Sequence, residues 1–118
     1  MSDIQRSHVG KRLSQVAEHR GVLYLAGQVA SDITQDMAGQ TRQVLASVDA
    51  LLAEHGSDKS QILFCQIYLS DMSQFAAMNA VWDAWVVQGH TPPRATVGAP
   101  LASTEKLIEV VVTAARMP

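Results

Sequence analysis

The segment Ile62–Leu69, ILFCQIYL, consists of β-branched, aromatic and apolar residues except for Gln66. Side chains of these kinds are enriched in strands, where successive residues point to opposite faces. The alternation predicts one face with Leu63, Cys65, Ile67 and Leu69 and another with Ile62, Phe64, Gln66 and Tyr68. We expect this segment to be a central strand of a sheet.

Helical patterns flank this strand on both sides. Upstream, apolar residues recur at helical spacing and Gly56 supplies a C-terminal stop; these residues are Val44, Val48, Leu51 and Leu52. Downstream, Asp71 is the expected N-cap, with Gln74 three residues later. Steps of three and four then connect Phe75, Met78, Trp82 and Trp85, and QGHTPP ends the second helix.

Strands are expected at both ends of the chain. Residues 14–19 and 22–27 form a predicted hairpin that turns at Arg20 and Gly21. Residues 94–99 and 107–115 form two further strands, linked by PLASTEK. The expected order is therefore β-β-α-β-α-β-β in one domain, residues 1–118. This order predicts an α+β fold with a mixed sheet and two helices on one face.

The composition limits the partners and the compartment. Hydrophobic residues make up 47% of the chain and charged residues only 17%, which is globular and favours burial of surface against further copies of the chain. The formal net charge is −2 and the basic residues are scattered, so no nucleic-acid surface is predicted. Without a signal peptide or an apolar segment approaching eighteen residues, we expect a cytoplasmic protein that does not enter the membrane.

Arg94 directly follows two prolines at the start of one predicted strand, and Glu109 lies in the next. If these strands pair as an antiparallel hairpin about residues 101–102, both side chains share a face within cross-strand reach. Two interpretations stay open. Such a pair is commonly a solvated ion pair. Alternatively, the guanidinium grips a small carboxylate with two hydrogen bonds while Glu109 orients a water molecule or handles a proton.

Other reactive side chains give weaker patterns. Cys65 is expected to be buried filler, because a lone cysteine in an apolar strand usually packs in the core. The four histidines lack metal-ligand spacing, so no metal site is predicted; they are His8, His19, His55 and His90. His90 precedes Arg94 closely and is either a solvated loop residue or part of a pocket rim.

Several separated motifs resemble the RidA/YjgF family of reactive-intermediate deaminases, and most of all its YoaB-like branch. They are LYLAGQVA, QTRQVLASVDALLAEHGSDKSQIL, FAAMNAVWDAWV, PPRATV and LIEVVVTAA, in that order. The resemblance spans nearly the whole chain after the first dozen residues. It implies a chorismate-mutase-like fold that assembles as a homotrimer, with three ligand pockets at the subunit interfaces.

The resemblance also implies roles for individual residues. Arg94 matches the arginine that binds the substrate carboxylate, and Glu109 matches the glutamate that positions the attacking water. Thr96 stands where the family often has cysteine and would offer main-chain groups to the substrate. Gly27 matches a glycine at the pocket edge, and Asn79 matches an asparagine that packs the helix or caps the site. No metal or organic cofactor is implied.

The implied reaction is the hydrolysis of 2-imino acids and enamines, such as 2-aminoacrylate and 2-iminopropionate, to 2-oxo acids and ammonia. Pro92 and Pro93 would restrict the approach to the strand and help to aim Arg94. One departure concerns Leu13, at or beside the position of a pocket tyrosine in the family's deaminases. The alternative is a trimer that binds a metabolite carboxylate without turnover. A third functional class, a ribonuclease, is disfavoured because acidic residues outnumber basic residues.

Overall fold

The computed structural model describes residues 3–118. The strands and helices follow the order β1 (Gln5–Val9), β2 (Ser14–His19), β3 (Val22–Leu25), β4 (Gln28–Val29), α1 (Met37–Glu54), β5 (Ile62–Leu69), α2 (Phe75–Trp85), β6 (Arg94–Gly98) and β7 (Ile108–Ala115). Short 3-10 turns, η1 (Lys59–Gln61) and η2 (Met72–Gln74), precede β5 and α2. None of the helices in this described range is both long and apolar enough to cross a membrane.

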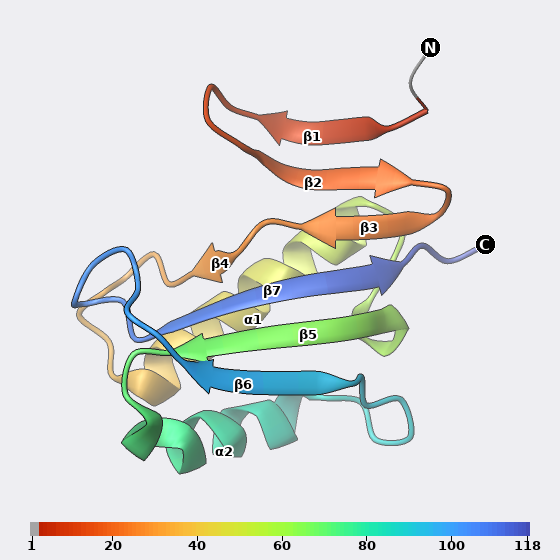
Figure 1. Cartoon of the computed structure of the whole chain (residues 1–118). Helices are drawn as coiled ribbons and strands as arrows, with labels where there is room; N and C mark the ends of the chain where they lie inside the picture. The colour runs from red at the N-terminus through yellow and green to blue at the C-terminus, as the bar shows by residue number, and fades with distance from the viewer. Residues whose placement is uncertain (1–2) are drawn as a thin grey trace.

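The strands form one mixed sheet in the order β1-β2-β3-β7-β5-β6, and β4 also pairs with β7 (Figure 1). All neighbours are antiparallel except β5 and β6, which run in parallel. A helix that follows a strand returns the chain to start a parallel neighbour, and α2 provides this crossover. The central position expected for the strand at residues 62–69 is confirmed, because β5 pairs on both edges.

The expected hairpin of the last two strands is wrong. β6 and β7 do not pair; β5 lies between them. Because the α2 crossover places β6 along one edge of β5, β7 pairs with the other edge. The connection after β6 therefore passes the end of β5 instead of making a tight turn.

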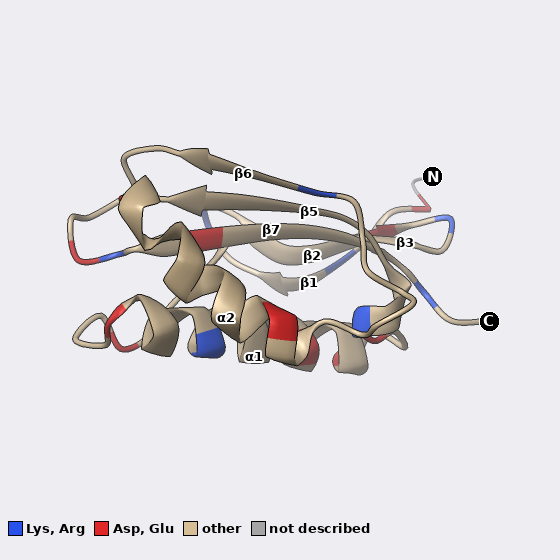
Figure 2. Cartoon of the chain, turned by 90° about the horizontal axis from the view of Figure 1, so that it is seen from below, with Lys and Arg blue, Asp and Glu red and all other residues tan. Residues whose placement is uncertain are grey.

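Both helices cover the same face of the sheet (Figure 2). The core lies between these layers, where α1 contributes Val44, Val48 and Leu52 and the central strands contribute Cys65, Ile67, Leu69, Ile108, Val110 and Val112. The predicted α+β fold with two helices on one face is confirmed. The opposite face of the sheet is covered by no helix, and we call it the open face.

A bulge in β5 changes the predicted alternation at its start. The register shifts between Ile62 and Phe64, so Ile62 turns into the core and Leu63 becomes 47% exposed. A bulge inserts one extra residue and reverses the facing of those before it. The prediction for Cys65, Ile67 and Leu69 is confirmed, whereas that for Leu63 is wrong.

The helix ends agree in part with the sequence prediction. α1 begins after Asp36, whose carboxylate accepts from the Gly39 N–H, and it ends before Gly56, which adopts a φ of 73°. Glycine favours that left-handed conformation, so the predicted stop is confirmed. Asp71 instead caps the short turn η2 by accepting from the Ser73 N–H, and α2 begins four residues later, at Phe75.

The first half of the sheet adds two strands to the predicted order. β2 and β3 form the expected hairpin, with φ of 53° at Arg20 and 79° at Gly21, as in a tight two-residue turn. β1 pairs with β2, and β4 is a two-residue strand on β7. The sequence of β1, QRSHV, is polar and largely exposed, so it lacks the apolar alternation that identifies a strand.

Candidate functional site

Arg94, the first residue of β6, lies against two aromatic side chains of α2. Its guanidinium carbon Cζ lies over the Trp82 ring at 5.0 Å from the centroid and over the Phe75 ring at 5.9 Å. Both distances are within the range of a cation–π interaction. Arg94 therefore points to the helix side of the sheet. We call Arg94, Thr96, Asn79, Phe75 and Trp82 the arginine region.

The positive charge of Arg94 has no counter-ion within residues 3–118. No hydrogen bond or salt bridge joins its guanidinium to another described side chain, although the residue is only partly exposed. Cys65 is in register with it on β5, but burial raises the pKa of the Cys65 thiol to about 12 and outweighs the opposing effect of the Arg94 charge. The thiol is therefore neutral at physiological pH, and the arginine is free to bind an anion.

Two more polar groups of the arginine region lack partners. Asn79 Oδ1 and Thr96 Oγ1 are buried and make no hydrogen bond to any residue in the range 3–118. Asn79 lies on α2 between Phe75 and Trp82, and these three positions share one helix face. Because native structures rarely leave buried polar atoms unpaired, both atoms suggest that a bound group completes this region.

The main chain of Thr96 faces the free edge of β6. Cys65 N–H donates to the Pro93 carbonyl, and Ala99 N–H donates to the Leu69 carbonyl. Alternate residues of a parallel strand bond to the same neighbour, so the odd-numbered positions of β6 pair with β5. The N–H and C=O groups of Thr96 then point away from β5, along the unpaired edge of the sheet.

Glu109 lies on β7, beside Gly27 in the connection between β3 and β4. A Cβ atom at residue 27 would overlap the Glu109 carboxylate and approach its carbon Cδ to 2.8 Å. Gly27 is therefore needed for space and not for an unusual backbone angle. A cavity of about 320 Å³ adjoins Glu109 and is lined by Tyr68, Ala99, Pro100, Leu101, Ala102 and Val111. We call Glu109, Gly27 and this lining the glutamate region.

Leu13 lies near the glutamate region. β2 and β3 pair with Val16 opposite Leu25, and the Ala26 N–H donates to the Gln15 carbonyl. If this register is extended by three residues, Leu13 lies opposite Gln28, the residue after Gly27. Its side chain is 54% exposed, so the position expected for a pocket tyrosine holds an exposed apolar residue.

Arg94 and Glu109 do not meet within one chain. Arg94 is in register with Cys65, whereas Glu109 is in register with Tyr68. Positions 65 and 68 point to opposite faces, because facing alternates along a strand. The expected cross-strand contact is therefore wrong, and so is the solvated ion pair that depended on it. The structure brings Arg94, Thr96 and Asn79 together on one face and Glu109 with Gly27 on the other.

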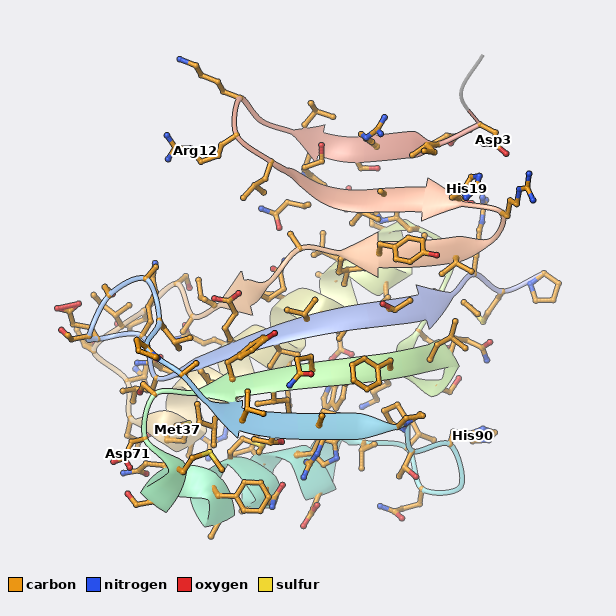
Figure 3. The ribbon with its side chains drawn as sticks, in the orientation of Figure 1. Asp3, Arg12, His19, Met37, Asp71 and His90 are labelled. Atoms are coloured by element: carbon orange, nitrogen blue, oxygen red, sulfur yellow. The ribbon has the colours of Figure 1, made fainter. Side chains whose placement is uncertain are left out.

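The sequence pattern placed the aromatic residues of α2 on a helix but did not indicate their contact with Arg94. Their two-turn spacing was visible, but the contact with Arg94 depends on the parallel pairing of β6. His90 lies on the loop before β6 and is exposed (Figure 3), so the solvated interpretation is favoured. Within residues 3–118 no three His, Cys, Asp or Glu side chains gather in a way that could hold a metal ion.

Comparison with known proteins places the chain in a family. Residues 4–116 match the family described as Endoribonuclease L-PSP. A RutC family protein from Haemophilus ducreyi is 44% identical over 112 residues, covering 95% of this chain and 96% of that protein. RutC family protein YoaB from Escherichia coli K12 is also 44% identical, over 95% of this chain and 97% of its own length.

Solved structures agree. The crystal structure of NMB1025 from Neisseria meningitidis, described as a member of the YjgF protein family, superposes with a TM-score of 0.96. The two chains are 43% identical, and the match covers 98% of this chain and 97% of that one. An uncharacterized protein from Pseudomonas aeruginosa gives a TM-score of 0.94 at 40% identity, with 97% of this chain and 99% of that one covered. The chain thus belongs to the RutC/YjgF (RidA) family and is similar to its YoaB members.

Proposed function

We propose that this protein hydrolyses 2-imino acids and their enamine tautomers to 2-oxo acids and ammonia, in a site shared between two copies of the chain. The observation that carries the proposal is the guanidinium of Arg94. It is held beside two aromatic rings and has no counter-ion in the described chain. A small carboxylate is a matching partner, because guanidinium and carboxylate form paired, charge-assisted hydrogen bonds.

In this proposal the arginine region binds the substrate carboxylate. Arg94 donates to its two oxygens, and the free main-chain groups of Thr96 hold the rest of the small molecule. Asn79 Oδ1 is a buried acceptor without a donor. An N–H group of the substrate is the kind of donor it lacks. Fixing the substrate in this way removes orientational freedom before the chemical step.

Glu109 is the proposed base. Its carboxylate takes a proton from a water molecule as the water oxygen bonds to the C=N carbon, giving a tetrahedral carbinolamine. In this reaction, which starts from the protonated imine, Glu109 passes this proton to the carbinolamine nitrogen. As the C–N bond breaks and ammonia leaves, Glu109 accepts the hydroxyl proton, the C=O bond of the 2-oxo acid forms, and the proton is released to solvent. An enamine first tautomerises to the imine. The imine is already reactive toward water, so positioning and one proton carrier are sufficient catalysis.

The two regions face opposite sides of the sheet, so the proposal requires Arg94 from one subunit and Glu109 from its neighbour. The open face offers a surface for such contact, since Tyr24 and Val97 are exposed there. A cyclic homotrimer makes three equivalent sites of this kind. The low content of charged residues, 17%, also favours an assembly that covers part of this surface. We propose that the protein acts in the cytoplasm, where pyridoxal-phosphate enzymes release such imines.

A turnover assay with an arginine variant tests the proposal. An amino-acid oxidase supplies 2-iminopropionate from alanine, and semicarbazide, with the yield measured at early times, traps the remaining imine faster than it reacts with the product pyruvate. The wild-type protein should lower the yield of trapped imine, whereas Arg94→Ala should leave it at the level without protein. Equal yields with the wild-type protein and with no protein would contradict catalysis. Equal acceleration by both proteins would remove Arg94 from the mechanism.

Binding without turnover is the second candidate, because the arginine region alone contains the parts that hold a carboxylate. Calorimetric titration with pyruvate, beside the turnover assay, separates the two. Pyruvate binding by a protein that does not accelerate imine loss would favour a binding or regulatory role. Salt-dependent RNA binding would instead favour the activity that the family description names, although the net charge of −2 weighs against it.

A further inference from the structure

We propose that Phe75 and Trp82 are positioning residues that set the affinity for the ligand carboxylate by holding the Arg94 guanidinium against their rings. This inference rests on one part of the proposed function, the binding of a carboxylate by Arg94. It does not depend on turnover.

The guanidinium contacts both rings at once. Phe75 and Trp82 are separated by seven positions on α2, which corresponds to about two turns and about 10.5 Å along the axis. Cζ of Arg94 lies 5.9 Å from one ring centroid and 5.0 Å from the other. The same cation therefore lies over both rings, although their residues are two helical turns apart.

The aromatic contacts leave the hydrogen-bonding capacity of Arg94 unused. A guanidinium has five N–H donors and no acceptor, and proteins usually fix it with a carboxylate. Such a carboxylate would compete with an anionic ligand for the same donors. The ring faces attract the cation through their quadrupoles instead. Phe75 and Trp82 thus limit the motion of the long side chain while its donors stay free for a ligand.

The position of Trp82 is itself supported by packing. Trp82 is 6% exposed, and its ring lies 5.3 Å from that of Trp85. Trp85 donates from Nε1 to Asp49 Oδ2 of α1 at 2.9 Å, and the Lys59 ammonium lies over its ring at 5.3 Å. Trp85 therefore takes part in a second cation–π contact that does not involve Arg94, which makes it a matched control.

Binding of propionate, measured by calorimetry, tests the inference without any chemical step. Phe75→Leu keeps an apolar side chain but removes the ring, and it should weaken propionate binding roughly three- to tenfold. Phe75→Tyr, which keeps the ring, should restore wild-type affinity, and Trp85→Phe, which keeps a ring beside Trp82, should leave it unchanged. Trp82→Leu should weaken binding at least as much. Phe75 is 37% exposed, so its replacement spares the core if the buried Trp82 variant fails to fold.

Tryptophan emission gives an independent readout. The chain has two tryptophans, so Trp85→Phe leaves Trp82 as the sole reporter beside Arg94. Propionate should change the emission of this variant, and the additional change Arg94→Ala should abolish the response. An unchanged emission on saturation with propionate would contradict contact between Trp82 and the ligand-binding cation.

The outcomes separate the two proposals. Wild-type protein that does not bind propionate would remove the carboxylate anchor, and the proposed function with it. Wild-type protein that binds propionate with the same affinity as Phe75→Leu would overturn the positioning role alone. Weaker binding by both Phe75→Leu and Trp85→Phe would also overturn it, because the effect would then belong to packing of α2 in general.

Discussion

The arginine region and the glutamate region hold opposite charges in different ways. Arg94 is fixed by large neighbours, since two aromatic rings of α2 lie on its guanidinium. The Glu109 carboxylate has room because residue 27 is a glycine, where a Cβ atom would occupy the place of the carboxylate. The first region faces the helix layer and the second the open face. The difference teaches that one chain of this fold holds an arginine and a glutamate on opposite faces of its sheet and does not bring them together.

Replacing the base should have the largest effect and should leave the arginine region intact. Glu109→Gln keeps the size of the side chain but removes the proton acceptor, so imine hydrolysis should slow by roughly 10²–10⁴-fold. The affinity for propionate should not change, because Arg94 is untouched. The turnover assay and calorimetry measure the two quantities. A parallel loss of propionate affinity would show that the regions are not separable.

Gly27→Ala should act on the same region through space alone. The added methyl displaces the Glu109 carboxylate, and a displacement of about 1 Å can cost roughly 100-fold in rate. In a Glu109→Gln background the same change should cost little more, because both substitutions remove one function. The four rates, measured in the turnover assay, give the coupling. Additive losses would mean that Gly27 acts independently of Glu109.

Mixing two inactive variants tests whether the regions meet between subunits. In the proposed homotrimer, Arg94→Ala and Glu109→Gln chains that are co-refolded in equal amounts should form mixed trimers in which one interface has both intact residues. Random assembly into a cyclic trimer should restore about a quarter of the wild-type activity. The turnover assay measures it, with separately refolded variants as the control. Failure to regain activity, despite mixed trimers shown by mass, would exclude a shared site.

Replacing Cys65 should have the smallest effect on ligand affinity, although Cys65 lies directly beside Arg94 in the sheet. Burial raises the pKa of its thiol from 9.0 to about 12, so the folded state holds the proton more tightly than the unfolded chain. The free energy of unfolding that the protonated thiol contributes is fully present below pH 9 and is lost as the pH rises toward 12. Cys65→Ala should retain propionate affinity and lack this alkaline loss, as urea unfolding at pH 8 and pH 11 can measure. Rapid reaction of the native thiol with a disulfide reagent at pH 8 would contradict the assignment.

Local sequence patterns predicted most of the helices and strands and indicated Arg94 and Glu109 as candidate site residues. The hairpin at Arg20 and Gly21 and the helix end at Gly56 follow from turn and cap chemistry within a few residues. The bulge at Leu63 was not predictable from alternation, because it depends on the register with β7. β1 was missed for a similar reason, since its polar residues gain order only by pairing with β2.

By itself the sequence determined the fold class, the candidates Arg94 and Glu109, and the family resemblance, because apolar periodicity and ordered motifs are properties of neighbouring residues. Only the tertiary structure decided where those candidates point. Parallel pairing of β6 with β5 turns Arg94 toward α2, while antiparallel pairing of β7 leaves Glu109 on the open face. Strand order is set by how helices and strands pack over long chain separations, so no local spacing encodes whether two side chains share a face.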